Sequence, residues 1–448
     1  MLNPGGYCWR GWTKMPLSWP CLAHASVVQL HMGMHDEAIH LAQEALAIYE
    51  QQVDDVGIAR VRRQLGQVAL LTGDYTAATH HLPAALALAQ STGMNRLEAD
   101  CLDALGSLYW NQGAYGEAQR YFEQARQRYQ DAAVANRQGE ANALNNLGFV
   151  AWSQGDYATA QRYHAAALQD FRQIGNRQGE GAALSSLGRV MERQGDFAAA
   201  AEHYHAALEL AQSSGDRQGE AITLSNLGFL AYHRGHYAQA GRHFTDCLAC
   251  CRAIGFRRYE AVALACLSLL AYLLGDNDPA EMLARQALQI GQESADPTLE
   301  AYGWTHLGHV LLARQQPAAA QTAYAQGFKL RQNMDDDGRA QEPLAGLAEC
   351  ALALGDLAAA QAHVEQILAY LQHSSLERTL IVAPIYWICY RVCHAVQHPQ
   401  APKLLNTAYA ILRTRAAALP DEESRRIFLH DVAMHHAVIV AAQAELSR

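Results

Sequence analysis

A four-residue motif returns at a fixed interval of 40 residues and constrains the fold more than any other feature of this sequence. Arg137-Gln138-Gly139-Glu140 recurs as Arg177-Gln178-Gly179-Glu180 and as Arg217-Gln218-Gly219-Glu220. With Arg137 as position 1, the register extends both ways and defines nine repeats over 15–376; the repeat 95–136 has 42 residues and the others have 40. Such a period is typical of architectures in which each repeat packs on its neighbours.

Several positions are shared by the repeats. Position 24 is always alanine, position 11 is leucine in all repeats but the first, and position 12 is always small. Position 19 is glycine except in the eighth repeat, where it is Gln315. Apolar residues at helical spacing, such as Leu144, Leu147 and Ala151, predict a first helix over positions 2–17, which the glycine ends, and a second helix follows over 22–36. Small residues at positions 12, 24 and 31 allow the paired backbones to approach closely.

The residues between repeats are suited to start helices. Asn176 and Asp216 each precede a new repeat, and their side chains can cap the helix that follows. The glutamate at position 4 favours the positive end of that helix.

The pattern Leu-Gly, then Gly-x-Tyr, then Ala resembles the tetratricopeptide repeat. Gly155-Asp156-Tyr157-Ala158-Thr159-Ala160 and Gly73-Asp74-Tyr75-Thr76-Ala77-Ala78 carry the resemblance, which covers all nine repeats. The 40-residue period is similar to that of Leu-Gly-Asn scaffold proteins and of bacterial regulators of the maltose-activator type. The resemblance implies an all-α fold, a tetratricopeptide-type right-handed α-solenoid of antiparallel helix pairs with a concave inner face.

The expected organisation has three parts: an irregular leader over 1–14, nine repeats over 15–376, and a degenerate tenth repeat with C-terminal capping helices over 377–448. In the last part we expect helices over 379–396 and 403–418, a short helix from the cap Asp421 to Phe428, and a final helix over 434–446. Pro16 and Pro20 interrupt the first helix of the first repeat. The N-terminus is therefore equally consistent with a divergent cap and with a fragment of a longer protein.

Charge and hydropathy limit the partners. Acidic residues outnumber basic ones by 44 to 34, for a net charge of -10, which argues against direct nucleic-acid binding. No apolar run approaches the roughly 20 residues that cross a bilayer, so we expect a cytoplasmic protein without membrane contact.

One segment implies a link to signalling ATPases. Residues 419–432 are similar to the closing segment of repeat regions in bacterial STAND-type proteins. The phosphate-binding motif Gly-x-x-x-x-Gly-Lys-Ser/Thr of those ATPases is absent, because the sequence contains no Gly-Lys pair. The resemblance therefore implies at most a sensor arm.

Histidines and cysteines are the residues that would first suggest catalysis or a metal. The 21 histidines are scattered, without a paired nucleophile or carboxylate. Cys247 and Cys250 form a Cys-x-x-Cys, but Cys247 occupies position 31, where most repeats have alanine, and zinc usually needs a second ligand pair. Cys389 and Cys393 lack one too. We therefore expect buried thiols, no metal or cofactor, no catalytic residues and no enzyme activity.

The resemblance places positions 6, 9, 10, 13, 16 and 17 of each first helix on the concave face. Amides there suit an extended peptide backbone, aromatic rings form pockets and arginine pairs with carboxylates. We expect a partner-binding groove formed by Trp110, Asn142, Asn145, Asn146, Phe149, Trp152, Ser185, Arg189, Arg193, Asn226, Phe229 and Tyr232.

The leading hypothesis is a non-enzymatic protein–protein interaction scaffold that binds a peptide or partner segment in this groove, in bacterial signalling or transcription control. The alternative is a small-molecule-sensing arm of a STAND-type regulator, in which an inducer binds a closed apolar pocket. A solvated face must be polar in any case, and Phe149, Trp152, Phe229 and Tyr232 would also serve as packing between repeats.

Overall fold

A computed structural model describes residues 35–131, 133–294, 296–334, 336–376, 381–419 and 422–446. Within these ranges the chain is helical and has no strand. It divides into two compact units, of which unit 1 ends at Gly195 and unit 2 begins at Asp196. The predicted leader over 1–14, Pro16, Pro20 and Asp421 lie outside the described residues.

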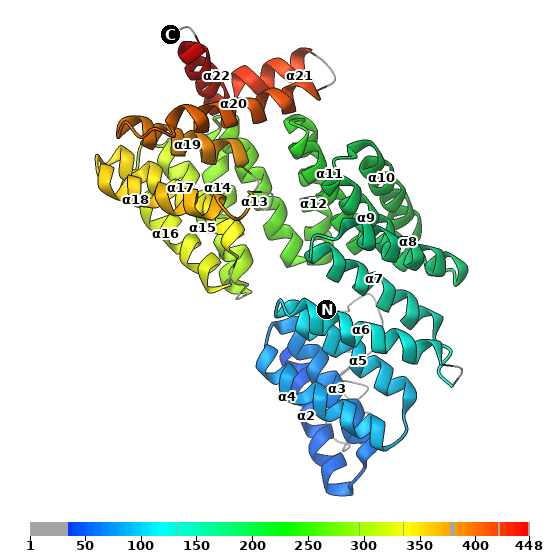
Figure 1. The fold of residues 1–448 in the computed structure, drawn as a ribbon. Coiled ribbons are helices and arrows are strands. Elements are labelled where there is room, and N and C mark those ends of the chain that lie inside the picture. Colours follow the sequence, from blue (N-terminus) through cyan, green and yellow to red (C-terminus); the bar gives the residue numbers. More distant parts are fainter. Residues whose placement is uncertain are drawn as a thin grey trace, which may run out of the picture. The chain divides into compact units, whose positions relative to one another are not determined.

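Unit 1 is a series of helices that alternate in direction (Figure 1). In chain order they are α2 (His35–Gln52), α3 (Asp55–Thr72), α4 (Tyr75–Ser91), α5 (Asn95–Asn111), α6 (Tyr115–Gln130), α7 (Arg137–Ser153), α8 (Tyr157–Gln173) and α9 (Arg177–Arg193).

Unit 2 continues the same pairing and ends in shorter elements. Its helices are α10 (Phe197–Ser214), α11 (Arg217–His233), α12 (Tyr237–Ile254), α13 (Arg257–Leu273), α14 (Asn277–Glu293), α15 (Pro297–Ala313), α16 (Pro317–Asn333), α17 (Asp337–Ala353), α18 (Leu357–Leu371), α19 (Val382–Ala395), α20 (Ala401–Ala417), α21 (Glu422–Arg426), the π-helix η2 (Ile427–Asp431) and α22 (Ala433–Leu446).

Each repeat from the second to the ninth is a helix pair, which confirms the all-α prediction. The first helix covers positions 1–17 and the second begins at position 21, within a residue of the predicted bounds. Gly155 ends the turn between α7 and α8 with φ 82°, a left-handed conformation that glycine adopts at no steric cost. Gln315 takes the same conformation at φ 60° in the eighth repeat, so the turn geometry persists where the glycine is lost.

The predicted caps between repeats are present. The Asn176 side chain accepts a hydrogen bond from the backbone N–H of Gly179 at 2.9 Å, and Asp216 accepts one from Gly219 at 2.9 Å. These bonds satisfy donors that the first turn of a helix leaves free.

Size matching within a repeat holds the two helices together. A Cβ atom at Gly228 would lie 2.6 Å from the Phe244 ring, and one at Gly308 would lie 2.7 Å from the Tyr324 ring. Both rings occupy position 28, opposite the glycine at position 12. Where position 12 is Ser268, position 28 shrinks to Ala284. The small residue at position 12 therefore makes room for a particular side chain of its own repeat.

A second size match joins some successive repeats and accounts for the glycine in two of the three copies of the recurring motif. A Cβ at Gly179 would lie 2.4 Å from Phe171, and one at Gly57 would lie 2.1 Å from Tyr49. Position 3 is therefore glycine where position 35 of the preceding repeat is aromatic. The sizes are exchanged later in the chain, where Gly291 occupies position 35 and Leu299 occupies position 3.

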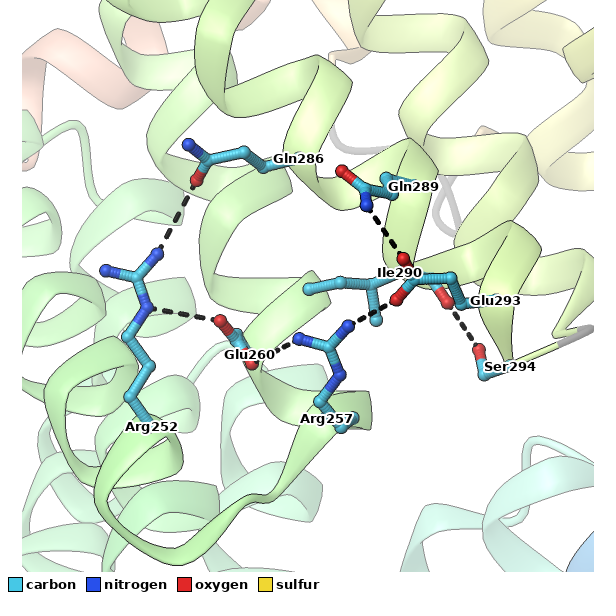
Figure 2. Close-up of polar contacts among 8 residues, drawn as sticks. All are labelled: Arg252, Arg257, Glu260, Gln286, Gln289, Ile290, Glu293 and Ser294. Carbon is cyan, nitrogen blue, oxygen red and sulfur yellow. Dashed lines mark hydrogen bonds and ion pairs between the residues drawn. The ribbon is translucent and has the colours of Figure 1, made fainter.

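The glutamate of the motif ties each repeat to the one before it. Glu180 accepts from Arg172 at 2.7 Å, and Glu260 accepts from Arg252 at 3.1 Å, each from a residue eight positions earlier. Figure 2 shows that Arg257 also reaches Glu260, at 3.2 Å. Since Glu260 is 8% exposed, its charge depends on these partners for compensation. The motif thus contributes a junction contact as well as a favourable helix start.

The C-terminal segment of unit 2 packs back on the repeats of the same unit. Helices α19 and α20 form the expected tenth pair, but the predicted helix through Phe428 stops at Arg426 and gives way to the π-helix η2. Phe428 is fully buried, its ring centroid 5.8 Å from that of Tyr237 and close to Gly235. The Phe428 carbonyl accepts from His435 Nδ1 at 2.7 Å. The wider turn therefore accompanies the insertion of Phe428 into unit 2.

Candidate functional site

The first helices form the inner layer of unit 1. Helix α3 contacts α5, α5 contacts α7, and α7 contacts α9. The second helices α4, α6 and α8 make no comparable contacts with one another within the described residues. Repeats that touch more through their first helices curve toward that side, so the first helices line the concave face of the unit.

Five of the predicted residues meet on this face and form what we call the arginine–aromatic cluster: Trp110 of α5, Phe149 and Trp152 of α7, and Arg189 and Arg193 of α9. The ring centroids of Trp110 and Phe149 are 6.4 Å apart. The Arg189 guanidinium carbon lies 4.6 Å from the Trp152 ring centroid and 5.9 Å from that of Phe149. Arg193 lies 5.6 Å from Trp152. Trp110 remains 37% exposed, which makes the cluster part of the surface.

Two polar groups of the cluster lack ordinary partners. Arg189 forms no ion pair with a carboxylate of the described residues, so its charge is compensated there only by aromatic faces. The Trp152 indole nitrogen is buried and has no hydrogen-bond acceptor within the described part of the chain. By contrast, the Trp110 indole N–H donates to Ser153 Oγ at 3.1 Å. An unmet donor beside a cation favours an anionic group at this point.

Amide and carboxylate side chains continue the face toward α5. Asn146 Nδ2 donates to Asp103 Oδ1 at 3.1 Å, and the Tyr129 hydroxyl donates to Asp100 at 2.8 Å. Burial raises the pKa of Asp103 to about 6. Asn142 is exposed. Sequence reasoning missed Asp100 and Asp103, although they occupy positions 6 and 9, which the register already assigned to this face.

Asn145 serves the interior. Its side-chain oxygen lies 2.8 Å from Nδ1 of His164, which is 1% exposed and also packs at 5.1 Å, edge to face, on Phe149. Burial, together with the nearby charge of Arg189, lowers the pKa of His164 to about 3. His164 is therefore a neutral packing residue that supports the cluster from below.

Two other predicted residues are buried. Ser185 of α9 is 8% exposed, and Tyr232 of unit 2 is 5% exposed with its ring 5.6 Å from Tyr237. Asn226 and Phe229 are half-buried, and Phe229 packs edge to face on Phe244 at 5.3 Å. Phe229 and Tyr232 thus contribute to packing within unit 2. One continuous groove that joins them to the cluster of unit 1 stays a prediction.

Unit 2 holds a buried polar network that sequence reasoning missed. His309 Nδ1 lies 2.7 Å from the Tyr324 hydroxyl, and His309 Nε2 lies 3.0 Å from Glu342. His306 Nδ1 donates to the Ala265 carbonyl at 2.8 Å, and burial lowers the pKa of His306 to about 4. His306, His309 and Glu342 occupy inner-face positions of their repeats, whereas Tyr324 occupies position 28 of a second helix, and all four side chains are buried. The network joins α15, α16 and α17 rather than facing a ligand.

The eight cysteines of the described residues are packed inside. Cys247 is fully buried and its thiol donates to the Ala221 carbonyl at 3.2 Å, while its sulfur lies 3.9 Å from that of Cys251. Burial raises the pKa of Cys389 to about 12. No group of three or more His, Cys, Asp or Glu residues in the described ranges is arranged to hold a metal ion.

No single helix among the described residues is long and apolar enough to cross a membrane. One bent pair, Glu422–Asp431 with Ala433–Glu445, meets the criteria jointly, with an angle of 84° between its parts.

Family models match most of the repeat region. A tetratricopeptide repeat model matches 21–91, 57–131, 139–213 and 219–293, and a second one matches 341–366. The chain belongs to the tetratricopeptide repeat family. No curated protein matches its sequence.

Solved structures share the fold at low sequence identity. A STAND protein with a tetratricopeptide repeat sensor from Pyrococcus horikoshii is 16% identical, with a TM-score of 0.51 over 71% of this chain. The chain spans about half of that protein, 49% of its length. A Rap protein complexed with competence and sporulation factor is 15% identical, with a TM-score of 0.56, and the match covers 79% of this chain and 97% of that one. The quorum sensor NprR from B. thuringiensis is 14% identical, with a TM-score of 0.52 and coverages of 78% and 97%.

Proposed function

We propose that the protein is a non-enzymatic interaction module and that the concave face of unit 1 binds an extended segment of a partner protein. The arginine–aromatic cluster carries this proposal. It combines a partly exposed Trp110 with Arg189, whose charge has no carboxylate partner within the described residues, on a face that amide and carboxylate side chains continue. Tryptophan and arginine are the residues most enriched at the energetic centres of protein interfaces.

The chemistry of the face suits a peptide backbone. An amide side chain donates and accepts at once, so Asn142 and Asn146 can each pair with a peptide N–H and C=O. The rings of Phe149 and Trp152 supply apolar area beside them, at little cost in side-chain entropy. The fold shared with a Rap protein complexed with competence and sporulation factor supports the same reading.

The test compares wild type with a Phe149→Ala, Trp152→Ala double variant. The matched control is Arg162→Ala on α8, because Arg162 is exposed and bonds only Thr159 of its own helix, at 2.8 Å. A partner captured from native lysate is divided into overlapping peptides, and their affinities are measured by fluorescence anisotropy, with folding checked by circular dichroism. We expect one peptide to bind wild type and control equally and the double variant at least tenfold more weakly, about 1.4 kcal/mol. Equal binding to all three proteins would exclude this face.

The second candidate is a small-molecule-sensing arm of a STAND-type signalling regulator. The fold shared with the STAND protein from Pyrococcus horikoshii, of which this chain spans 49%, favours that setting. A thermal-shift survey of metabolites tests it. A compound that stabilises wild type and the double variant alike would support a ligand site away from the cluster.

A further inference from the structure

We infer that the segment bound by unit 1 has asymmetric charge: a carboxylate is held by Arg189, and a cationic side chain faces Asp103 about four residues away. The inference rests on the proposed function, since it names the chemistry of the ligand for the same face. It follows from four observations on α5, α7 and α9.

The first observation is the state of Arg189. Its side chain is half-buried between the rings of Phe149 and Trp152, at 5.9 Å and 4.6 Å. Partial burial removes water from a guanidinium, and aromatic faces compensate for only part of that loss. A carboxylate compensates for more, because it accepts two parallel N–H bonds from the guanidinium. The most favourable addition to this side chain is therefore an anionic oxygen pair.

The second observation is the Trp152 indole N–H. It is buried without an acceptor among the described residues, and the Arg189 guanidinium carbon lies 4.6 Å from the centroid of the same ring. A buried donor left unmet costs about 1–3 kcal/mol. The Trp152 ring thus has an unmet donor as well as a cation over its face, and both favour an anionic ligand group.

The third observation is the opposite charge on α5. Asp103 is half-buried, with Asp100 one turn away on the same helix. The groups that face the pair are Asn146 at 3.1 Å from Asp103, Tyr129 at 2.8 Å from Asp100 and Arg96 at 3.7 Å from Asp100, with the charge of Arg63 also felt at Asp103. Burial raises the pKa of Asp103 to about 6, so its charged form is under-compensated. A ligand cation would restore that compensation, and a second ligand carboxylate would be repelled.

The fourth observation is spacing. Asn146 contacts Asp103 and lies one turn before Phe149 on α7, and Phe149 in turn faces Arg189. This chain of contacts spans on the order of 15 Å from Asp103 to Arg189. An extended segment covers that distance in about four residues. Asymmetric charge at this spacing would also fix which end of the segment lies over α9.

The experiment uses the full chain and a set of synthetic ten-residue peptides. All peptides share an apolar and amide-rich background; they carry Lys and Glu four residues apart, Lys and Gln, Gln and Glu, or two Glu. A fifth series places the carboxylate at a free C-terminus, with an amidated form as its control, which separates a terminal from a side-chain carboxylate. Affinities are measured by fluorescence anisotropy at low salt for wild type, Arg189→Gln, Asp103→Asn and the control Arg162→Gln.

We expect the peptides with both charges to bind wild type at least tenfold more tightly than those with one charge. Arg189→Gln should abolish the preference for the carboxylate alone, and Asp103→Asn the preference for lysine alone, while Arg162→Gln changes neither. Binding that is insensitive to peptide charge but lost in the Phe149→Ala, Trp152→Ala variant would overturn the inference and leave the proposed function standing. Affinities that are equal for all peptides and for that variant would overturn both.

Discussion

Replacing Gly228 by alanine should destabilise the protein, and the sign of the effect should reverse when Phe244 is removed. Gly228 occupies position 12 of α11, and a Cβ there would lie 2.6 Å from the Phe244 ring. Phe244 is 1% exposed, so the ring has no free volume into which it could move. The neighbouring repeat shows the compensated combination, with Ser268 opposite Ala284.

The magnitude follows from two opposing effects. Overpacking a core by one methyl group costs about 1–3 kcal/mol, whereas Gly→Ala inside a helix contributes about 1 kcal/mol of stability. In the wild-type background Gly228→Ala should therefore cost about 1 kcal/mol. Phe244→Ala alone should cost about 3–5 kcal/mol. In that background the new methyl group meets no ring, and Gly228→Ala should stabilise by about 1 kcal/mol, for a coupling energy of about 2 kcal/mol between the two sites.

Hydrogen exchange measured by mass spectrometry on α11 and α12 is the appropriate assay. Arrays of repeats do not always unfold in one step, and exchange reports the local free energy of opening. The four proteins of the cycle are compared under identical conditions. If Gly228→Ala destabilised both backgrounds equally, the glycine would be needed for its backbone rather than for the room it leaves to Phe244, and size matching within repeats would be refuted.

Three further predictions concern pH, the C-terminal segment and the junctions. Burial lowers the pKa of His164 to about 3, so below about pH 6.5 the unfolded chain binds a proton at this histidine that the folded chain does not bind. Relative to His164→Phe, wild type should therefore lose about 2 kcal/mol of unfolding free energy between pH 8 and pH 5, and parallel pH profiles of the two proteins would contradict this. Phe428→Ala should lower the unfolding free energy by about 3–5 kcal/mol and speed hydrogen exchange both in α22 and at the start of α12, and Phe428→Leu should have smaller effects. Faster exchange in α22 alone would show that the contact with Tyr237 does not stabilise α12. Glu260→Gln should lower the unfolding free energy, measured by urea denaturation at low salt, by about 1 kcal/mol and make that free energy less sensitive to salt. An unchanged salt dependence would argue against the ion pairs with Arg252 and Arg257 in Figure 2.

The helix pairs could be predicted from the sequence because their determinants are local. The leucine at position 11, the alanine at position 24 and the glycine at position 19 each specify a feature that lies within one repeat. The role of Gly179 was less accessible, since its reason is Phe171 in the preceding repeat. The π-helix at Phe428 depends on residues almost 200 positions away in the sequence, around Gly235 and Tyr237, and local patterns carry no sign of it.

The helix face on which the candidate site lies could be predicted from the sequence, but the burial of its residues could not. The register identified the face on which Trp110, Phe149 and Arg189 lie, because helical periodicity sets where a side chain points. Burial depends on how the repeats pack, which is why Ser185 and Tyr232 lie inside although they share the same register. Asp103 shares that face, but its value as a ligand contact depends on its partial burial beside Asn146, which the sequence does not show.

The size match at aromatic junctions has a consequence for the evolution of such an array. A repeat with Phe171 at position 35 accepts only a successor with glycine at position 3, whereas one with Gly291 at position 35 can be followed by Leu299. A repeat with an aromatic residue at position 35 thus restricts the choice of its successor. Duplication of a repeat that has glycine at position 3 and an aromatic residue at position 35 preserves the packing at its junctions. Exchange of unlike repeats places side chains at these two positions that clash or leave a cavity. The order of the repeats is therefore constrained by packing at their boundaries, independently of the residues on the concave face.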